Sequence, residues 1–444
     1  MAEPQNETQA ATQAEYHDLP EEKVKQLIEL MNSTTDTKIP AQKEIIACFR
    51  LAMDEQMLDY LIACGPEPVT KDQLEEEFCI LQRQGVLPVT QSWESFWAEI
   101  MDMSFMMPLP DRTHYQLASI FPGWIELSVS GPLNPKRRAI LNRFMDFWVL
   151  LRKLNVAPLR LLTNMKGVKS LQTETPHMGT LTSVVTRSSS KRPAEDAAAV
   201  GAVEASAPQD AFAQDASTQD ASPSKRTIQV NKTLTSEHQV LTKGSVFELI
   251  ARHKDELAVM NCFCRQYKQM NGGEACHHHL PLESCLSMGV ISRQLVENGV
   301  ARHVDYDEAV AMMEEFERNG CIHTTFHYGS NADNEAMVVC NCCVDCCLLY
   351  GGYQQGYMSK IFVKAFNRPE LVDAGACTGC NQCGLHCPSD AMRYNKALGR
   401  LEFMYENCVG CGQCVTQCRF GVHRMVPDER PVFVKTKKPA ERQA

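Results

Sequence analysis

Two cysteine runs with one shared spacing constrain this chain more than any other feature of its sequence. The first reads CTGCNQCGLHCP from residue 377, and the second reads CVGCGQCVTQC from residue 408. Both follow C-x2-C-x2-C-x3-C, a spacing in which a short loop wraps one face of a cubane iron–sulfur cluster and offers it three thiolates. The fourth cysteine of each run lies on the following helix and ligates the other cluster. The spacing therefore predicts two [4Fe–4S] clusters.

Each predicted cluster takes three ligands from one run and its fourth from the other. The two ligand sets are Cys377, Cys380, Cys383 and Cys418, and Cys408, Cys411, Cys414 and Cys387. Structural zinc sites also use CxxC pairs. Two evenly repeated runs of four, with Pro388 after the first, favour iron–sulfur chemistry instead. Gly379, Gly410 and Gly412 would let the loop backbone approach a cluster closely.

These runs and their surroundings, about residues 370 to 427, resemble the bacterial-type two-[4Fe–4S] ferredoxins. The resemblance implies a pseudo-twofold β-α-β repeat with a cluster at each end. In one respect the sequence departs from the family, because Arg419 follows Cys418 where the family usually has proline. We expect the added positive charge to raise the reduction potential of that cluster relative to its neighbour.

A second block of cysteines lies upstream, and its densest part is CNCCVDCC at residues 340 to 347. The candidate metal-site residues are Cys262, Cys264, Cys276, Cys285, Cys340, Cys342, Cys343, Cys346 and Cys347. Adjacent cysteine side chains diverge, so they cannot easily bind one metal ion together. If residues 342–347 are helical, Cys342 and Cys346 share one face of the helix, and Cys343 and Cys347 share another. Two upstream cysteines would complete a four-ligand site, whereas Cys321, at a predicted helix end, is expected in packing.

Three interpretations of this block remain open from the residues alone. It could hold a further iron–sulfur cluster, as the neighbouring clusters favour, or a structural zinc ion. It could also be a reactive dithiol pair, because vicinal cysteines form strained and labile disulfides.

The block CxCR, two spaced cysteines and then CNCCxxCC resembles a group of iron–sulfur proteins common in anaerobic bacteria. In that group the block precedes a two-cluster ferredoxin module and follows a winged-helix-like N-terminal part. The resemblance covers most of the chain outside residues 172–226. It implies an electron-transfer role and adds Arg265 to the candidate metal-site residues, without indicating a substrate.

Local sequence patterns predict secondary structure and domain boundaries for the rest of the chain. Thr70 and Ser92 are N-cap candidates before two amphipathic stretches, and MMPLPDRTHYQLASIF predicts a hairpin. The QDA repeats near residues 209–219 indicate a chain that buries too little apolar surface to fold. We expect an α+β protein with a winged-helix-like helical domain (15–170), a disordered Ala/Ser/Pro/Asp-rich linker (172–226), a cysteine-rich α/β metal-binding domain (227–365) and a ferredoxin-like β-α-β repeat (366–430).

Compartment and partners follow from composition. The sequence begins without a signal-peptide pattern and has no apolar run of about 18 residues. Its 21 cysteines are therefore expected to be reduced, metal-bound or redox-active in the cytoplasm. A formal charge of −10 argues against nucleic acid as the main partner, although the basic segment 136–160 leaves DNA binding open.

The sequence thus predicts an iron–sulfur protein that relays single electrons to or from a partner oxidoreductase or redox complex. It would be an electron-transfer component or an oxidoreductase subunit rather than a stand-alone catalyst, since no nucleotide-binding loop or catalytic triad pattern occurs. The alternative is a redox-sensing regulator that binds DNA through its N-terminal domain. The predicted cofactors are two [4Fe–4S] clusters, with a further iron–sulfur cluster or zinc at the middle block.

Overall fold

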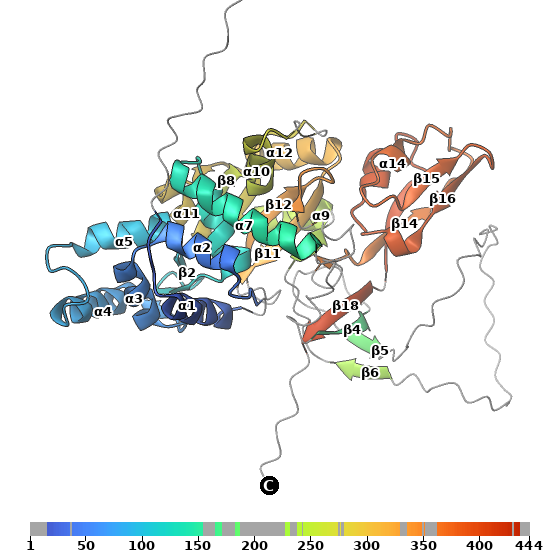
Figure 1. The fold of residues 1–444 in the computed structure, drawn as a ribbon. Helices are drawn as coiled ribbons and strands as arrows, with labels where there is room; N and C mark the ends of the chain where they lie inside the picture. Colours follow the sequence, from blue (N-terminus) through green and yellow to red (C-terminus); the bar gives the residue numbers. More distant parts are fainter. Residues whose placement is uncertain are drawn as a thin grey trace, which may run out of the picture.

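The structure is a computed structural model that describes residues 16–35, 38–153, 165–170, 183–186, 227–230, 238–241, 243–273, 276, 279–328, 335–348, 350, 362–428 and 430–435. Figure 1 shows three parts in chain order: a mainly helical N-terminal part, a middle part built on a sheet, and a smaller C-terminal module. The protein is therefore of mixed helix and strand.

The N-terminal part is built from seven α-helices, one π-helical turn and three short strands among the described residues. They are α1 (Glu21–Ser33), α2 (Lys43–Ala52), α3 (Glu55–Cys64), β1 (Val69–Thr70), α4 (Lys71–Arg83), α5 (Trp93–Asp102), β2 (Met106–Pro108), β3 (His114–Leu117), the turn Ile120–Trp124, α6 (Ile125–Val129) and α7 (Pro135–Lys153). Phe49, Phe105 and Trp124 stack in its core, with ring centroids 4.5 and 5.0 Å apart at Trp124.

Local signals set the helix starts in this part. The hydroxyl of Thr70 accepts the backbone N–H of Gln73, and the Gln73 side chain accepts the N–H of Thr70, so α4 begins with a complete capping box. At the start of α5 the Ser92 hydroxyl accepts the N–H of Ser95. Both expected helix starts are confirmed, as is the hairpin of β2 and β3. The order α3, β1, α4, α5, β2, β3 agrees with the expected winged-helix-like arrangement, which stays a prediction at the level of the fold family.

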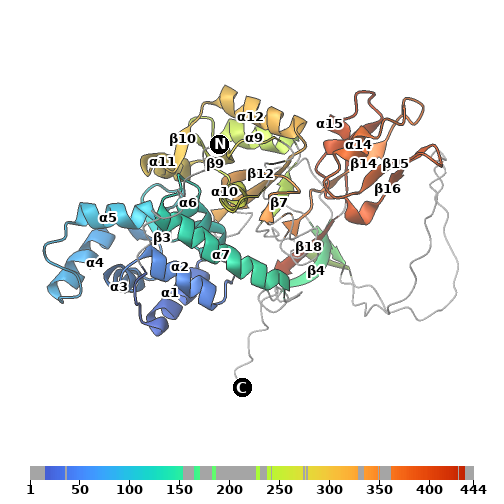
Figure 2. The ribbon, with the colours of Figure 1, turned by 45° about the horizontal axis from the view of Figure 1, so that its top comes forward.

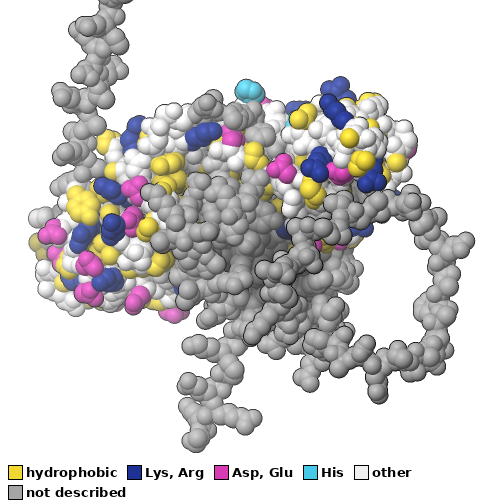
Figure 3. Space-filling view, turned by 45° about the vertical axis from the view of Figure 1, so that its right-hand side comes forward, with side chains coloured by type: hydrophobic (Ala, Val, Ile, Leu, Met, Phe, Trp, Pro, Cys, Tyr) yellow, Lys and Arg dark blue, Asp and Glu magenta, His cyan; other side chains and the backbone are white. Residues whose placement is uncertain are grey.

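The basic stretch that begins at residue 136 lies largely on α7, and part of its charge is already paired. Arg137 is buried and forms an ion pair with Asp102 at 2.7 Å. Arg143 pairs with Asp146 at 3.4 Å on the helix surface. The face drawn in Figure 3 intersperses acidic, basic and hydrophobic side chains over its described residues. No continuous basic field is visible on that described face.

The middle part is a seven-stranded sheet with helices packed against it. Its elements are β7 (His238–Leu241), α9 (Lys243–Arg252), β8 (Leu257–Asn261), α10 (Phe263–Met270), β9 (Glu283–Met288), α11 (Val290–Glu297), β10 (Ala301–His303), α12 (Tyr306–Arg318), β11 (Ile322–His327), β12 (Ala336–Cys342) and β13 (Phe362–Val363). The strand order is β10-β8-β9-β12-β11-β7-β13, antiparallel except for β13 on β7. Figure 2 shows α7 running beside this part, where it contacts α10.

Burial explains the sheet's composition. Strands β11 and β12 lie at its centre and are almost entirely buried, as the apolar run AMVVC predicts. Helix α12 is amphipathic and packs Ala309, Met313 and Phe316 against the same core. The centre of the sheet is thus a rigid platform, and β12 ends at the cysteine block.

The C-terminal module has internal pseudo-symmetry. Its elements are β14 (Asn367–Leu371), α14 (Gln382–Leu385), β15 (Met392–Asn395), β16 (Arg400–Phe403), the 3-10 turn Tyr405–Asn407, α15 (Gln413–Thr416) and β17 (His423–Pro427). Strand β14 pairs with β17 and β15 pairs with β16, both antiparallel. Each half carries one short helix after its cysteine loop. This is the ferredoxin-like arrangement expected from the repeat.

A further four-stranded sheet joins distant parts of the chain. Its order is β18-β4-β5-β6, with β4 (Met165–Ser170), β5 (Ser183–Thr186), β6 (Thr227–Val230) and β18 (Arg430–Lys435). Strand β5 falls within residues 172–226, where we expected a linker. The rest of that predicted linker lies outside the described residues. Over the described part of the chain, no helix is long and apolar enough to cross a membrane.

Candidate metal centres

The predicted ligand sets divide the eight cysteines of the C-terminal module into two groups of four. The outer thiol group is Cys377, Cys380, Cys383 and Cys418. Burial, together with the neighbouring charges of Cys418, Cys377 and Cys380, raises the pKa of Cys383 to about 11. Cys418 belongs to the second run, yet its charge acts on Cys383 of the first.

The inner thiol group is Cys387, Cys408, Cys411 and Cys414. Burial raises the pKa of Cys414 to about 12, with added contributions from Cys408, Cys387 and Cys383. Burial also raises the pKa of Cys411, and the Cys414, Cys387 and Cys408 charges add to that effect. The Cys387 charge thus acts on Cys411 and Cys414 of the second run, whereas the exchange of ligands between the runs stays a prediction.

The loops around these thiols accommodate a close backbone approach. Gly379 has φ 71°, and a Cβ there would lie 2.8 Å from the Tyr394 ring. Gly410 has φ 76°, and a Cβ there would lie 2.5 Å from the Asn367 carbonyl oxygen. The N–H of Ala391 donates to the Cys387 sulfur at 3.1 Å. Four soft donors in each group, with N–H groups directed at sulfur, fit an iron–sulfur cluster.

The two groups differ in their surroundings. In the outer thiol group Cys380 is exposed, and the Arg419 charge is among the causes that lower its pKa, after hydrogen bonds from Gln382 and Thr378. In the inner thiol group Cys411 packs against an apolar cluster that includes Val409 and Cys342, and Cys340 and Cys347 of the middle part pack against the same cluster. One group thus faces solvent and the other faces the upstream cysteines.

The sequence CNCCVDCC is a strand end followed by a turn, so the expected helical pairing is wrong. Cys342 is the last residue of β12, where it pairs with Ile322 of β11, and residues 344–346 form a turn. Sheet pairing commits the backbone through Cys342, which prevents a helix from starting there. Adjacent cysteines do diverge as expected. Cys343 and Cys346 point to one side, and Cys342 and Cys347 point to the other.

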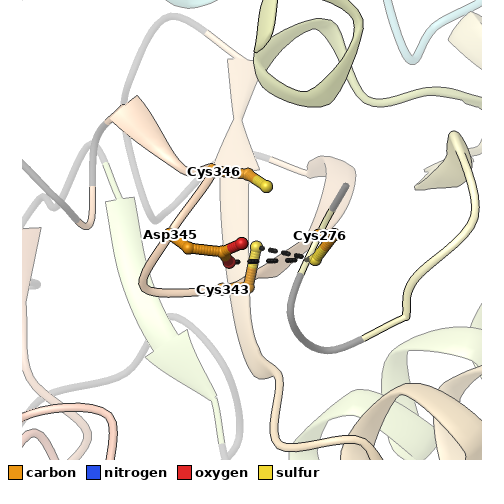
Figure 4. Close-up of side chains that lie close together, drawn as sticks. All are labelled: Cys276, Cys343, Asp345 and Cys346. Atoms are coloured by element: carbon orange, nitrogen blue, oxygen red, sulfur yellow. Dashed lines mark hydrogen bonds between the residues drawn. The ribbon is translucent and has the colours of Figure 1, made fainter. Parts of the chain in front are cut away.

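The first side is the four-residue group of Cys276, Cys343, Asp345 and Cys346 (Figure 4), whose ligand atoms all lie within 4.8 Å of one another. The sulfurs of Cys276 and Cys343 are 3.6 Å apart, and Cys276 Sγ lies 3.8 Å from an oxygen of Asp345. The three cysteines are buried, and Asp345 is partly buried. This set could hold a single metal ion.

The second side is the six-thiol group, made of Cys262, Cys264, Cys285, Cys340, Cys342 and Cys347. Its members contact one another in a chain, with Cys285 and Cys340 sulfurs 3.9 Å apart. Hydrogen bonds from Cys264 and Cys285 hold the pKa of Cys262 well below its ordinary value. Hydrogen bonds from Cys264 and Cys342 do the same for Cys347. Beside these thiols is a cavity of about 20 Å³, and so many soft donors favour an iron–sulfur centre or another thiophilic metal.

Arg265 lies between the two middle groups. Its side chain is 1% exposed, and it donates to the Asn341 carbonyl at 2.8 Å, to Ser284 Oγ and to Cys343 Sγ at 3.7 Å. Burial lowers its pKa, but the negative charges of Cys262 and Cys343 raise it above the ordinary value. Among the described residues no carboxylate forms an ion pair with it, so neighbouring cysteines would be its counter-ions when deprotonated.

Lys268 and Asp345 were not predicted as site residues. Lys268 Nζ contacts Asp345 at 3.2 Å and Cys346 Sγ at 3.9 Å. The position of Asp345 between Cys343 and Cys346 was the only sequence signal for this carboxylate. No sequence pattern indicated Lys268, which lies on α10. Cys321 is buried packing, as expected, and His279 is exposed outside the four-residue group.

Comparisons with known proteins concern the C-terminal module. Residues 370–419 match the family model of the 4Fe-4S dicluster domain. The formate dehydrogenase-O iron–sulfur subunit of Escherichia coli is 31% identical over 65 residues, 14% of this chain and 22% of that protein. The formate dehydrogenase iron–sulfur subunit of Haemophilus influenzae is also 31% identical over 65 residues, 14% of this chain and 21% of that protein.

These likenesses are partial. The chain spans about a fifth of the length of the curated relatives that it matches. No solved structure matches the chain. The comparisons support iron–sulfur clusters and electron transfer for the C-terminal module, in agreement with the sequence.

Proposed function

We propose that this protein transfers single electrons through two [4Fe–4S] clusters to or from a partner oxidoreductase in the cytoplasm. The outer thiol group would hold one cluster and the inner thiol group the other. The observation that carries the proposal is that the Cys418 charge acts on Cys383 of the first run and the Cys387 charge acts on Cys411 of the second. A [4Fe–4S] cluster, when bound, accepts and releases one electron at a potential that its surroundings tune.

The difference in exposure between the two groups indicates where a partner would dock. Cys380 is exposed, and Leu385 and Phe420, near the outer thiol group in sequence, are 69% and 49% exposed. A partner would therefore dock at the outer thiol group. The matched relatives are iron–sulfur subunits of formate dehydrogenases, which supports an oxidoreductase as the partner.

The six-thiol group would be a further iron–sulfur centre. Its position supports this, because Cys411 of the inner thiol group packs against the same apolar cluster as Cys340 and Cys347. The inner thiol group would then lie between the outer thiol group and the middle part. The N-terminal part, with its winged-helix element order, would dock a partner rather than DNA, because Arg137 is buried and ion-paired.

The test is iron and acid-labile sulfide per full-length chain, purified without oxygen, together with the electron paramagnetic resonance spectrum after reduction. We expect at least about eight irons, since each cubane carries four, and rapid one-electron oxidation by a viologen dye. Cys411→Ala should remove about four irons. Cys79→Ala, which changes an exposed cysteine of α4, should remove none.

Two outcomes would contradict the proposal. Fewer than about four irons per chain in freshly purified protein would exclude a pair of cubanes. A full complement of iron that neither accepts nor donates an electron would assign the clusters a structural role. Loss of iron on Cys262→Ser, with the C-terminal signals intact, would support the further centre at the six-thiol group. Unchanged iron in that variant would leave those thiols free for dithiol chemistry.

A further inference from the structure

We propose that the four-residue group binds one zinc ion, with Cys276, Cys343 and Cys346 as sulfur ligands and Asp345 as the oxygen ligand. This site would be separate from every iron–sulfur centre in the protein. The inference does not depend on the proposed electron transfer, because it concerns side chains outside the other three thiol groups.

Ligand spacing distinguishes a single ion from a cluster. In tetrahedral coordination with zinc–sulfur bonds of about 2.3 Å, neighbouring sulfur ligands lie about 3.8 Å apart. Cys276 and Cys343 sulfurs are 3.6 Å apart, and Cys276 Sγ is 3.8 Å from Asp345 Oδ1. A cubane holds its ligands on four outward-facing irons, so its ligand atoms need wider spacing. Four atoms within 4.8 Å of one another therefore suit one ion.

Charge supports the same assignment. Three thiolates and one carboxylate carry four negative charges against the two of a zinc ion, which leaves two to be balanced. Lys268 contacts Asp345 Oδ2 and Cys346, and Arg265 contacts Cys343, so two cations lie against the ligands. Lys268 also fixes the orientation of the carboxylate, whose other oxygen, Oδ1, faces Cys276, as outer contacts of metal ligands do.

The position of the site indicates a structural role for the metal ion. Cys343 and Cys346 close the turn after β12, and Cys276 comes from the segment between α10 and β9. A metal ion would tie these segments together. The same turn carries Cys342 and Cys347 on its other side, so the zinc ion would hold two members of the six-thiol group in place.

The experiment measures zinc and iron in the same samples of full-length protein, purified without oxygen, and records the zinc-edge X-ray absorption spectrum. We expect about one zinc per chain, with three sulfur neighbours at about 2.3 Å and one oxygen at about 2.0 Å. Cys343→Ser should abolish zinc binding and leave the C-terminal iron unchanged. Lys268→Ala, which removes only an outer contact, should weaken zinc affinity roughly 10-fold to 100-fold in chelator competition.

Cys321→Ser is the matched control, because Cys321 is buried in the same core but is not among the four residues. It should keep its zinc. The wild-type spectrum tests the inference even if a cysteine variant fails to fold. Wild-type protein without zinc, a zinc shell of four sulfurs, or iron scattering at this site would overturn the inference. Each of these results is independent of whether the C-terminal clusters transfer electrons.

Discussion

Glu126 is a carboxyl group enclosed in the core where the turn Ile120–Trp124 meets α6. Its Oε2 accepts the N–H of Gly123 at 2.8 Å, whereas Oε1 has no hydrogen-bond partner among the described residues. Burial raises its pKa to about 8, and the hydrogen bond from Gly123 opposes the rise only in part. At neutral pH the group is therefore mostly protonated in the folded protein.

This residue predicts a pH dependence of stability. The folded-state pKa lies above the ordinary value of 4.5, so the stability that the protonated form contributes is lost as pH rises through about 8. We expect the unfolding free energy of the wild type to fall by roughly 3–5 kcal/mol from this group between about pH 5 and pH 9. Urea denaturation of Glu126→Gln should show a flatter pH profile. Glu94→Gln, at an exposed position, should keep the wild-type slope, and equal slopes in all three proteins would refute the prediction.

At the scale of elements, α15 joins the C-terminal module to the middle part. Gln413 is 1% exposed and donates to the carbonyls of Glu317 and Cys321 at 3.0 and 2.7 Å. Thr416 donates to the Glu317 carboxylate at 2.6 Å. The end of α12 is thus held against the inner thiol group by hydrogen bonds from one short helix.

Gln413→Leu should lower the unfolding free energy by about 1–3 kcal/mol, because buried carbonyl groups lose their side-chain donor. Hydrogen exchange at the end of α12 should also accelerate. The pseudo-symmetric position offers a control, since Gln382 follows Cys380 as Gln413 follows Cys411, yet it is exposed. Gln382→Leu should change the unfolding free energy by less than about 0.5 kcal/mol. Similar losses in both variants would mean that the contact with α12 contributes nothing.

Sequence predicted the features of this structure that depend on neighbouring residues, but not those that depend on contacts between distant segments. Short-range signals succeeded: the twin cysteine spacing, the Thr70 cap and the apolar face of α12 all depend on neighbours in the chain. The middle block could not be resolved that way. Whether Cys343 belongs to a helix or a turn depends on β12 pairing with β9 and β11, and Lys268 reaches Asp345 only because α10 packs nearby. Sequence named these thiols as candidates, but their partition into two groups depends on the fold.

For the whole molecule, the distribution of charge predicts that duplex DNA is not a ligand. Arg137 and Arg143 of α7 pair with carboxylates, and the net charge is −10. Fluorescence anisotropy with a labelled duplex should show no binding tighter than about 10⁻⁴ M at physiological salt. Removing the charges with Lys136→Ala and Arg138→Ala should change nothing. Tight binding that weakens steeply with salt and depends on these residues would instead favour the regulator.

The burial of Arg265 affects how the newly synthesised chain folds. A guanidinium buried with thiolates as its counter-ions is destabilising when those thiolates are protonated, since an uncompensated buried charge costs about 3–5 kcal/mol. In newly synthesised chains that have not bound metal, the seven-stranded sheet should therefore fold incompletely. Such chains should remain accessible to proteases. In cells deprived of iron and zinc, the amount of this protein would be set by degradation rather than by synthesis.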